Sequence, residues 1–156
     1  MPPSKTFDVV DTTIAAIHAA YRDGTLTARL LVQTYLDRIK AYDKRGPMIN
    51  ALISINPRAL EEADRLDAAF RTAGFVGPLH GIPIIMKDQG DVAEMPTTLG
   101  SVLFRGHMPG RDCFVVAKLK KAGAIFIAKS TLGELGAGDT HGSLFGSTRN
   151  VFDLQR

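Results

Sequence analysis

The strongest candidate for a chemically active side chain in this sequence is Lys87. It follows Ile-Pro-Ile-Ile-Met at residues 82–86, a short and continuously apolar run that is typical of a strand covered on both faces. Ligands bind at the carboxyl ends of strands in open α/β sheets. A poorly solvated ammonium group at such an edge can lose its proton near neutral pH, and the neutral amine can then act as a general base. The local pattern alone favours a simpler interpretation, in which the lysine extends into solvent and pairs with Asp88.

Two apolar strands joined by a helix are expected to hold Lys87 in place. The second run, Ala-Ile-Phe-Ile-Ala at residues 124–128, follows a helix that we expect to begin at an Asp112 cap and to end at Gly123. This order forms a βαβ unit, whose strands are parallel and whose crossover is right-handed. Thr131 and Glu134 then fit a capping box for a short helix.

The residues before Phe75 indicate scaffold and no chemistry. We expect three helices, one from an Asp11 cap to about residue 22, one from a Thr27 cap to Gly46, and one from an Asn56 cap to Gly74. A strand at residues 48–55 is expected between the second and third helices. The pattern predicts an α/β fold in which N-terminal helices precede the first strands of a mixed, largely parallel sheet covered by helices. No internal repeat or interdomain linker is evident, so residues 1–156 are expected to form a single domain.

The glycine-rich segment after the second apolar run offers a competing function. Gly136, Gly138 and Gly142 superficially resemble a dinucleotide-binding loop. The spacing is G-x-G-x-x-x-G, and residues 130–135 separate it from the strand, whereas a phosphate-binding loop follows its strand directly. A nucleotide-binding α/β module without hydrolytic activity is therefore the alternative function.

Composition restricts the classes of partner. Lys and Arg number 19 against 16 Asp and Glu, and the charges are interspersed, so no nucleic-acid partner is expected. The single cysteine, Cys113, cannot form an intrachain disulfide or a Cys-rich zinc site, and the four histidines lack ligand spacing, so we expect no metal. No stretch approaches the length of a membrane span, and no apolar signal-peptide run follows residues 1–5. A cytoplasmic protein without a membrane partner is the expectation.

Several ordered segments resemble the amidase-signature family of hydrolases. GPLHGIPIIMKD at residues 77–88 resembles the strand that carries the catalytic lysine of that family, and MPTTLGS at residues 95–101 resembles the loop that follows it. AGA at residues 122–124 and AKSTLGEL at residues 128–135 resemble the next helix and strand of the family. GSTRN at residues 146–150 is similar to the run that leads into its serine-rich core. Several matches in the right order make this resemblance specific, and it covers essentially the whole chain.

The resemblance implies an amidase that hydrolyses a carboxamide C–N bond through a Ser–cis-Ser–Lys triad. Lys87 takes the place of the catalytic lysine, and a relay serine held by a cis peptide passes it the proton of the nucleophilic serine. Backbone N–H groups near the nucleophile stabilise the oxyanion. Gly136 and Ala137 lie beside the substrate in this interpretation. The resemblance also implies a small-molecule amide substrate and no cofactor, and it allows a homodimer of the complete protein.

Only one of the three triad members is expected within the 156 residues. The family's Gly-Gly-Ser-Ser-Gly-Gly run, which holds the relay serine, would begin a few residues beyond Arg156, with the nucleophile further on. Ser101, Ser143 and Ser147 are no substitutes, because none lies in a G-x-S-x-G elbow. We therefore expect the N-terminal part of a larger amidase-signature domain, inactive by itself, and a truncated non-catalytic product is a further alternative. A stand-alone amidase is preferred over the glutaminase subunit of a tRNA-dependent amidotransferase, since the sequence shows no clear tRNA-binding feature.

Overall fold

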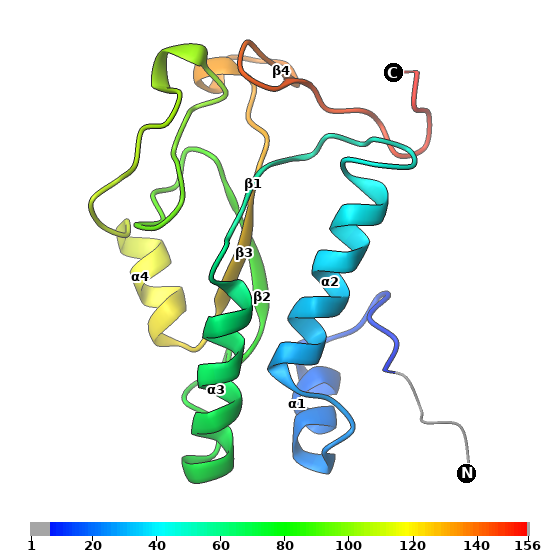
Figure 1. Cartoon of the computed structure of the whole chain (residues 1–156), viewed down its shortest axis with the longest axis vertical. Coiled ribbons are helices and arrows are strands. Elements are labelled where there is room, and N and C mark those ends of the chain that lie inside the picture. The colour runs from blue at the N-terminus through cyan, green and yellow to red at the C-terminus, as the bar shows by residue number, and fades with distance from the viewer. Residues whose placement is uncertain (1–6, 156) are drawn as a thin grey trace.

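The computed structural model describes residues 7–155, which form a mixed α/β fold. Residues 1–5, where no signal peptide is expected, lie outside the described part of the chain. The α/β class expected from the sequence is confirmed. In chain order the elements are α1 (Ile14–Asp23), α2 (Ala28–Tyr42), β1 (Leu52–Ile55), α3 (Ala59–Ala73), β2 (Pro83–Lys87), η1 (Val102–Phe104), α4 (Phe114–Lys121), β3 (Ile125–Ser130), η2 (Glu134–Gly136), β4 (His141–Gly142) and β5 (Gly146–Ser147) (Figure 1).

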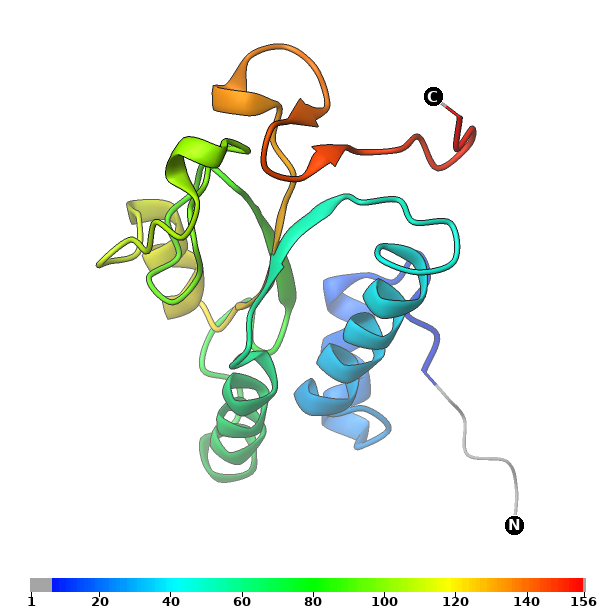
Figure 2. The same cartoon turned by 45° about the horizontal axis from the view of Figure 1, so that its top comes forward.

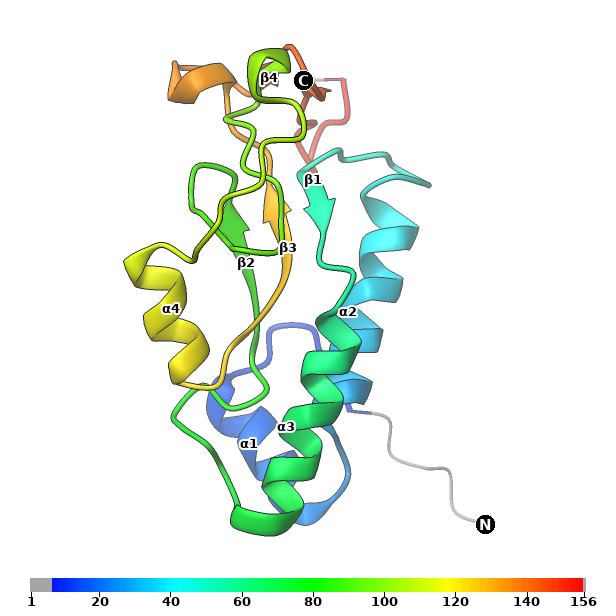
Figure 3. The same cartoon turned by 60° about the vertical axis from the view of Figure 1, so that its left-hand side comes forward.

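The main sheet has three strands in the order β1-β3-β2, with β3 in the centre. β2 runs parallel to β3, and β1 runs antiparallel to it, as the arrow directions in Figure 3 show. The parallel pairing of β2 and β3 through the intervening α4 is expected from the sequence and is confirmed. The register places Lys87 opposite Ser130, so β2 and β3 end together at one edge of the sheet.

Helices cover the two faces of the sheet unequally. The larger buried cluster joins α1, α2 and α3 to one face and includes Leu31, Ala63 and Ile125. The smaller cluster lies on the other face, where Phe126 packs against Val116 of α4. Figure 2 shows α4 on one side of the strands and α1 and α2 on the other. Within residues 7–155, no helix combines the length and the apolar character that crossing a bilayer requires.

The predicted helix caps are confirmed only in part. Thr27 caps α2 by accepting a hydrogen bond from the N–H of Leu30, as expected. The prediction of Asp11 as the cap of α1 is wrong, because Thr13 has the extended backbone that a cap needs whereas Asp11 has a φ of 51°. Asn56 does not cap α3 directly; its Oδ1 accepts from the N–H of Arg58, the residue that precedes the helix.

Two further helix starts differ from expectation because tertiary contacts compete for the side chains. Asp112 does not cap α4, which begins after Cys113; its carboxylate accepts instead from the N–H of Ala93. The capping box at Thr131 is also wrong, since its hydroxyl pairs with Thr148 and the short helix η2 follows Gly133. The first strand is shorter than residues 48–55, and the second helix ends at Tyr42.

Candidate active site

Lys87 is the last residue of β2 and is exposed. Successive side chains of a strand alternate between its faces. Ile84 and Met86 pack into the cluster beneath α4, so the alternation places Ile85 and Lys87 on the opposite face, where Ile85 is 46% exposed. Within residues 7–155 the ammonium of Lys87 forms no hydrogen bond or ion pair. The expected poor solvation of Lys87 is therefore not found in this part of the protein, and the expected pairing with Asp88 is wrong.

The carboxylate of Asp88 forms its hydrogen bonds with the loop that follows β2 and not with Lys87. The side chain of Asp88 is completely buried. The Oδ2 atom accepts hydrogen bonds from Oγ1 of Thr98 at 2.6 Å, from the N–H of Thr98 at 3.2 Å and from the N–H of Gly100 at 3.1 Å. A carboxylate with three such donors holds the backbone of residues 98–100 in one place.

Asp88 forms an ion pair with Lys129 instead of Lys87. Lys129 lies in β3, is completely buried, and has its Nζ atom 3.4 Å from Oδ1 of Asp88. The same ammonium donates to the carbonyl of Pro96 at 2.8 Å and to Oγ1 of Thr97 at 2.7 Å. Burial lowers the pKa of Lys129, and the charge of Asp88 opposes that shift in part.

The sequence pattern assigns no role to Lys129, because the second apolar run ends at Ala128. A signal was available: Lys129 follows four residues that are buried in a central strand, and a lysine there needs an acid or several acceptors nearby. Asp88, at the end of the neighbouring parallel strand, was the nearest acid in the predicted topology.

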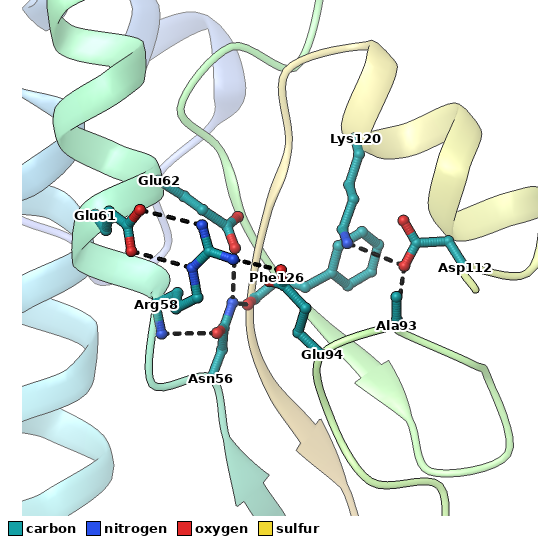
Figure 4. A network of polar contacts seen from close by, with 9 residues as sticks. All are labelled: Asn56, Arg58, Glu61, Glu62, Ala93, Glu94, Asp112, Lys120 and Phe126. Carbon is teal, nitrogen blue, oxygen red and sulfur yellow. Dashed lines mark hydrogen bonds and ion pairs between the residues drawn. The ribbon is translucent and has the colours of Figure 1, made fainter. Parts of the chain in front are cut away.

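The rest of the loop after β2 is anchored to α3 and α4 (Figure 4). Asp112 accepts from the N–H of Ala93 at 2.8 Å and pairs with Lys120 of α4 at 2.9 Å. Arg58, at the start of α3, forms an ion pair with Glu94. Further polar contacts in the same view join Asn56 to the carbonyl of Phe126 in β3 and to Glu62 of α3. The loop beside Lys87 is thus held in position by contacts with both α3 and α4.

Gly136 and Ala137, the predicted substrate-binding residues, lie on and just after η2 and are exposed. η2 follows β3 at the edge of the sheet where Lys87 ends β2, and Figures 1 and 3 show it at that end. The structure therefore brings them to the same edge as Lys87 without a direct contact among the described residues. Their place beside a substrate stays a prediction.

Glu134 connects the two loops at this edge. Its carboxylate accepts from Oγ of Ser101 at 2.6 Å and from Oγ of Ser143 at 2.8 Å. These hydrogen bonds lower the pKa of the Glu134 carboxyl. A carboxylate so stabilised is a weaker base than an ordinary glutamate, and the expectation that neither serine is a nucleophile stays a prediction.

Two non-glycine residues at this edge have left-handed backbone conformations. Leu99 has a φ of 52° and Leu135 a φ of 55°, and the N–H of Leu135 donates to the carbonyl of Leu99 at 2.8 Å. Residues in this conformation are uncommon and persist where surrounding contacts over-determine them. Gly100 next to them has no room for a side chain, since a Cβ there would lie 2.4 Å from the carbonyl oxygen of Leu132.

The glycine-rich segment lacks the features of a phosphate site. The N–H groups of Gly136 and Ala137 donate to the carbonyls of Gly133 and Glu134, so they are not free to bind a phosphate. Across residues 7–155, no three His, Cys, Asp or Glu side chains are grouped as a metal site would require. The geometry gives the nucleotide-binding alternative no support.

The chain is similar in sequence and in fold to known proteins. A family model described as Amidase matches residues 30–156. A glutamyl-tRNA(Gln) amidotransferase subunit from Acidothermus cellulolyticus is 34% identical over 96% of this chain and 29% of its own length. The crystal structure of native peptide amidase from Stenotrophomonas maltophilia is 36% identical, with a TM-score of 0.88 over 93% of this chain and 31% of the other. An amidase family protein from Bacillus anthracis is 30% identical, with a TM-score of 0.84 over 91% of this chain and 29% of the other. The chain spans about 30% of the length of these relatives.

Proposed function

The chain belongs to the amidase family, and on that premise we propose that it forms the N-terminal part of an enzyme that hydrolyses the C–N bond of a carboxamide, with Lys87 as the general base. The observation that carries the proposal is the state of Lys87. It ends β2 at the carboxyl edge of the sheet, its ammonium has no partner within residues 7–155, and the loop beside it is held by buried contacts. A base must be free to exchange a proton and must extend from a backbone of fixed position, and the free ammonium of Lys87 at the end of a paired strand supports that role.

The chemistry proposed for Lys87 is transfer of one proton in each direction. The neutral amine accepts the proton of a serine hydroxyl, through a second serine, as the hydroxyl oxygen attacks the amide carbonyl. The resulting ammonium returns the proton to the nitrogen that leaves, and water then hydrolyses the acyl-enzyme ester. Both serines are expected in the part of the family domain that lies beyond Arg156. Gly136 and Ala137 are proposed to contact the substrate, because they are exposed and follow β3 at the edge where Lys87 lies.

The preferred substrate is a small-molecule amide other than glutamine. Support comes from the likeness to a protein named peptide amidase, while the likeness to an amidotransferase subunit makes glutamine the substrate to test against it. A cytoplasmic location and a homodimer of the complete protein stay predictions.

A direct test measures ammonia release by the complete protein from glutamine, from a C-terminally amidated dipeptide and from a short aliphatic amide. Each assay is run with and without amidotransferase partner subunits. Cleavage of the dipeptide amide or the aliphatic amide without partners supports a stand-alone amidase, whereas glutamine as the best substrate would overturn that preference. Release from none of the three would overturn the amidase proposal. A polypeptide of residues 1–156 alone is the control and should release no ammonia, because a base without a nucleophile has nothing to activate.

Ala137 allows the substrate contact to be tested separately. Ala137→Leu should raise KM by roughly tenfold and leave kcat nearly unchanged, since added bulk beside a bound substrate weakens binding in the ground and transition states alike. Steady-state kinetics on the best amide measures both constants. An unchanged KM would remove Ala137 from the binding site.

A further inference from the structure

We propose that the buried pair Asp88–Lys129 positions Lys87 for catalysis by fastening the loop of residues 96–100 to the adjoining ends of β2 and β3. This inference rests on the function proposed above for Lys87. Neither Asp88 nor Lys129 touches the reacting atoms in this proposal, and both act as positioning residues.

The ammonium of Lys129 faces three acceptors, and two of them belong to the loop. Its Nζ atom donates to the carbonyl of Pro96 and to the hydroxyl of Thr97, and it lies 3.4 Å from Asp88. Lys129 and Asp88 are both completely buried. A buried charge that loses its partners is strongly disfavoured, so the loop cannot lift from Lys129 without a large penalty.

Asp88 transfers this constraint to Lys87, its immediate neighbour in the chain. The N–H of Asp88 donates to the carbonyl of Ser130 at 3.1 Å, which continues the β2–β3 pairing one residue beyond Lys87. The carboxylate of Asp88 holds Thr98 and Gly100 at the same time. The backbone of Lys87 is therefore fixed from its own strand and from the residue that follows it.

The same loop extends the constraint to the residues proposed to bind substrate. The carbonyl of Leu99 accepts from the N–H of Leu135, and the carbonyl of Gly100 accepts from the N–H of Leu144. One continuous set of contacts thus runs from Lys129 through Asp88 and the loop to η2. Catalysis tolerates displacements of the reacting groups only when they are well below 1 Å. A base and a substrate-binding segment that are both held by one loop keep their relative positions within such a limit.

Stability alone does not require charged side chains at these two positions. Apolar residues of similar volume often replace a buried ion pair with no loss of stability, whereas removal of one partner is strongly destabilising. Within residues 7–155, the side chains of Asp88 and Lys129 bond only to each other and to the loop. The specific effect of these hydrogen bonds is therefore to fix the position of that loop.

The test compares single and double substitutions in the complete enzyme, with ammonia release from the best amide of the three-substrate panel as the readout. Asp88→Asn and Lys129→Met each leave one buried charge unpaired and should lower the melting temperature. The double substitution removes both charges and should recover most of that loss. If the pair positions Lys87, kcat of the double variant stays about 10- to 100-fold low while KM changes less than about threefold. Recovery of kcat together with the melting temperature would overturn the proposal.

Thr98→Val provides a second route in case the charged variants do not fold. It removes the hydroxyl that donates to Asp88 at 2.6 Å and keeps the shape of the side chain. We expect kcat to fall about tenfold with KM little changed. Thr72→Val is the matched control, because the hydroxyl of Thr72 bonds only to carbonyls of its own helix, α3. Equal kcat in these two variants would also overturn the proposal.

Lys87→Ala in the same assay separates the two proposals. Normal turnover in Lys87→Ala would reject the proposed function itself. Loss of turnover in Lys87→Ala with full kcat in a folded Asp88→Asn/Lys129→Met variant would reject only the positioning role.

Discussion

Lys87 and Lys129 have nearly the same sequence context and opposite environments. Each follows an apolar run, and each lies at the carboxyl end of one of two adjacent parallel strands. Lys87 is exposed and without a partner in residues 7–155, whereas Lys129 is completely buried and faces three acceptors. The loop of residues 96–100 accounts for the difference, because its Pro96 and Thr97 supply two of the acceptors that Lys129 contacts and Lys87 contacts neither. The same loop thus covers Lys129 and leaves Lys87 exposed.

The largest expected effect is on catalysis and tests the first half of the comparison. Lys87→Ala in the complete protein should lower kcat by roughly a thousandfold or more, because catalytic groups that act as a unit lose their function together. KM should change little. Steady-state ammonia release measures both constants, with the exposed Lys118→Ala of α4 as the control that should match the wild type. Near-normal turnover in Lys87→Ala would end the assignment of Lys87 as the base.

The second-largest expected effect is on stability and tests the buried member of the comparison, Lys129. Lys129→Ala leaves Asp88 buried without its cation, and loss of one partner of a buried pair costs about 3–5 kcal/mol of unfolding free energy. Lys87→Ala should change that free energy by less than about 0.5 kcal/mol, as is usual for an exposed side chain. Urea denaturation of the two variants gives the difference. Equal midpoints would show that the two lysines are not in different environments.

His80 sharpens the comparison, because it is buried like Lys129 but forms no ion pair with a carboxylate within residues 7–155. Its side chain is 1% exposed, its Nδ1 accepts from the N–H of Val76, and burial followed by the charge of His18 lowers the pKa of His80. Below pH about 6.5 the unfolded chain binds a proton that folded His80 does not, so stability falls as the pH falls.

For one proton the loss cannot exceed about 1.4 kcal/mol per pH unit. Melting temperatures of the complete protein at pH 7.5 and 5.5 should differ more for the wild type than for His80→Gln. The same difference in both proteins would mean that His80 does not resist protonation.

A small effect on stability is expected for a lysine whose burial lies between that of Lys87 and that of Lys129. Lys120 of α4 is 27% exposed and pairs with Asp112 at 2.9 Å. Lys120→Met should lower the unfolding free energy by at most about 1 kcal/mol, since solvent reduces the value of such a pair and Asp112 keeps its bond to Ala93. Denaturation midpoints measure it beside Lys129→Ala. A loss as large as that of Lys129→Ala would mean that the degree of burial does not determine how much each ion pair contributes to the unfolding free energy.

Local patterns predicted the framework of the site. The apolar runs at residues 82–86 and 124–128 indicated two parallel strands, and the end of the first run indicated the location of Lys87. Thr27 and Gly74 marked one helix start and one helix end. These features depend on spacing within a few residues, which a single sequence displays directly.

Partners distant in the sequence were not predicted. Asp88 was matched with its neighbour Lys87 and pairs instead with Lys129, 41 residues away. Asp112 was expected to cap its own helix and instead holds Ala93. Each of these carboxylates could satisfy a local or a distant donor equally well, and only the packed structure decides between them.

The central place of β3 has a consequence for the order in which the chain can fold. β1 and β2 do not pair with each other, and both pair with β3, which lies after them in the sequence. During synthesis neither strand has its sheet partner until residues 125–130 have left the ribosome. The unpaired backbone N–H and C=O groups along their edges then remain open through most of the translation of this segment, the period in which strand edges are most prone to wrong association. Pausing of the ribosome just before β3 should therefore be more harmful to the yield of folded protein than a pause of equal length after it.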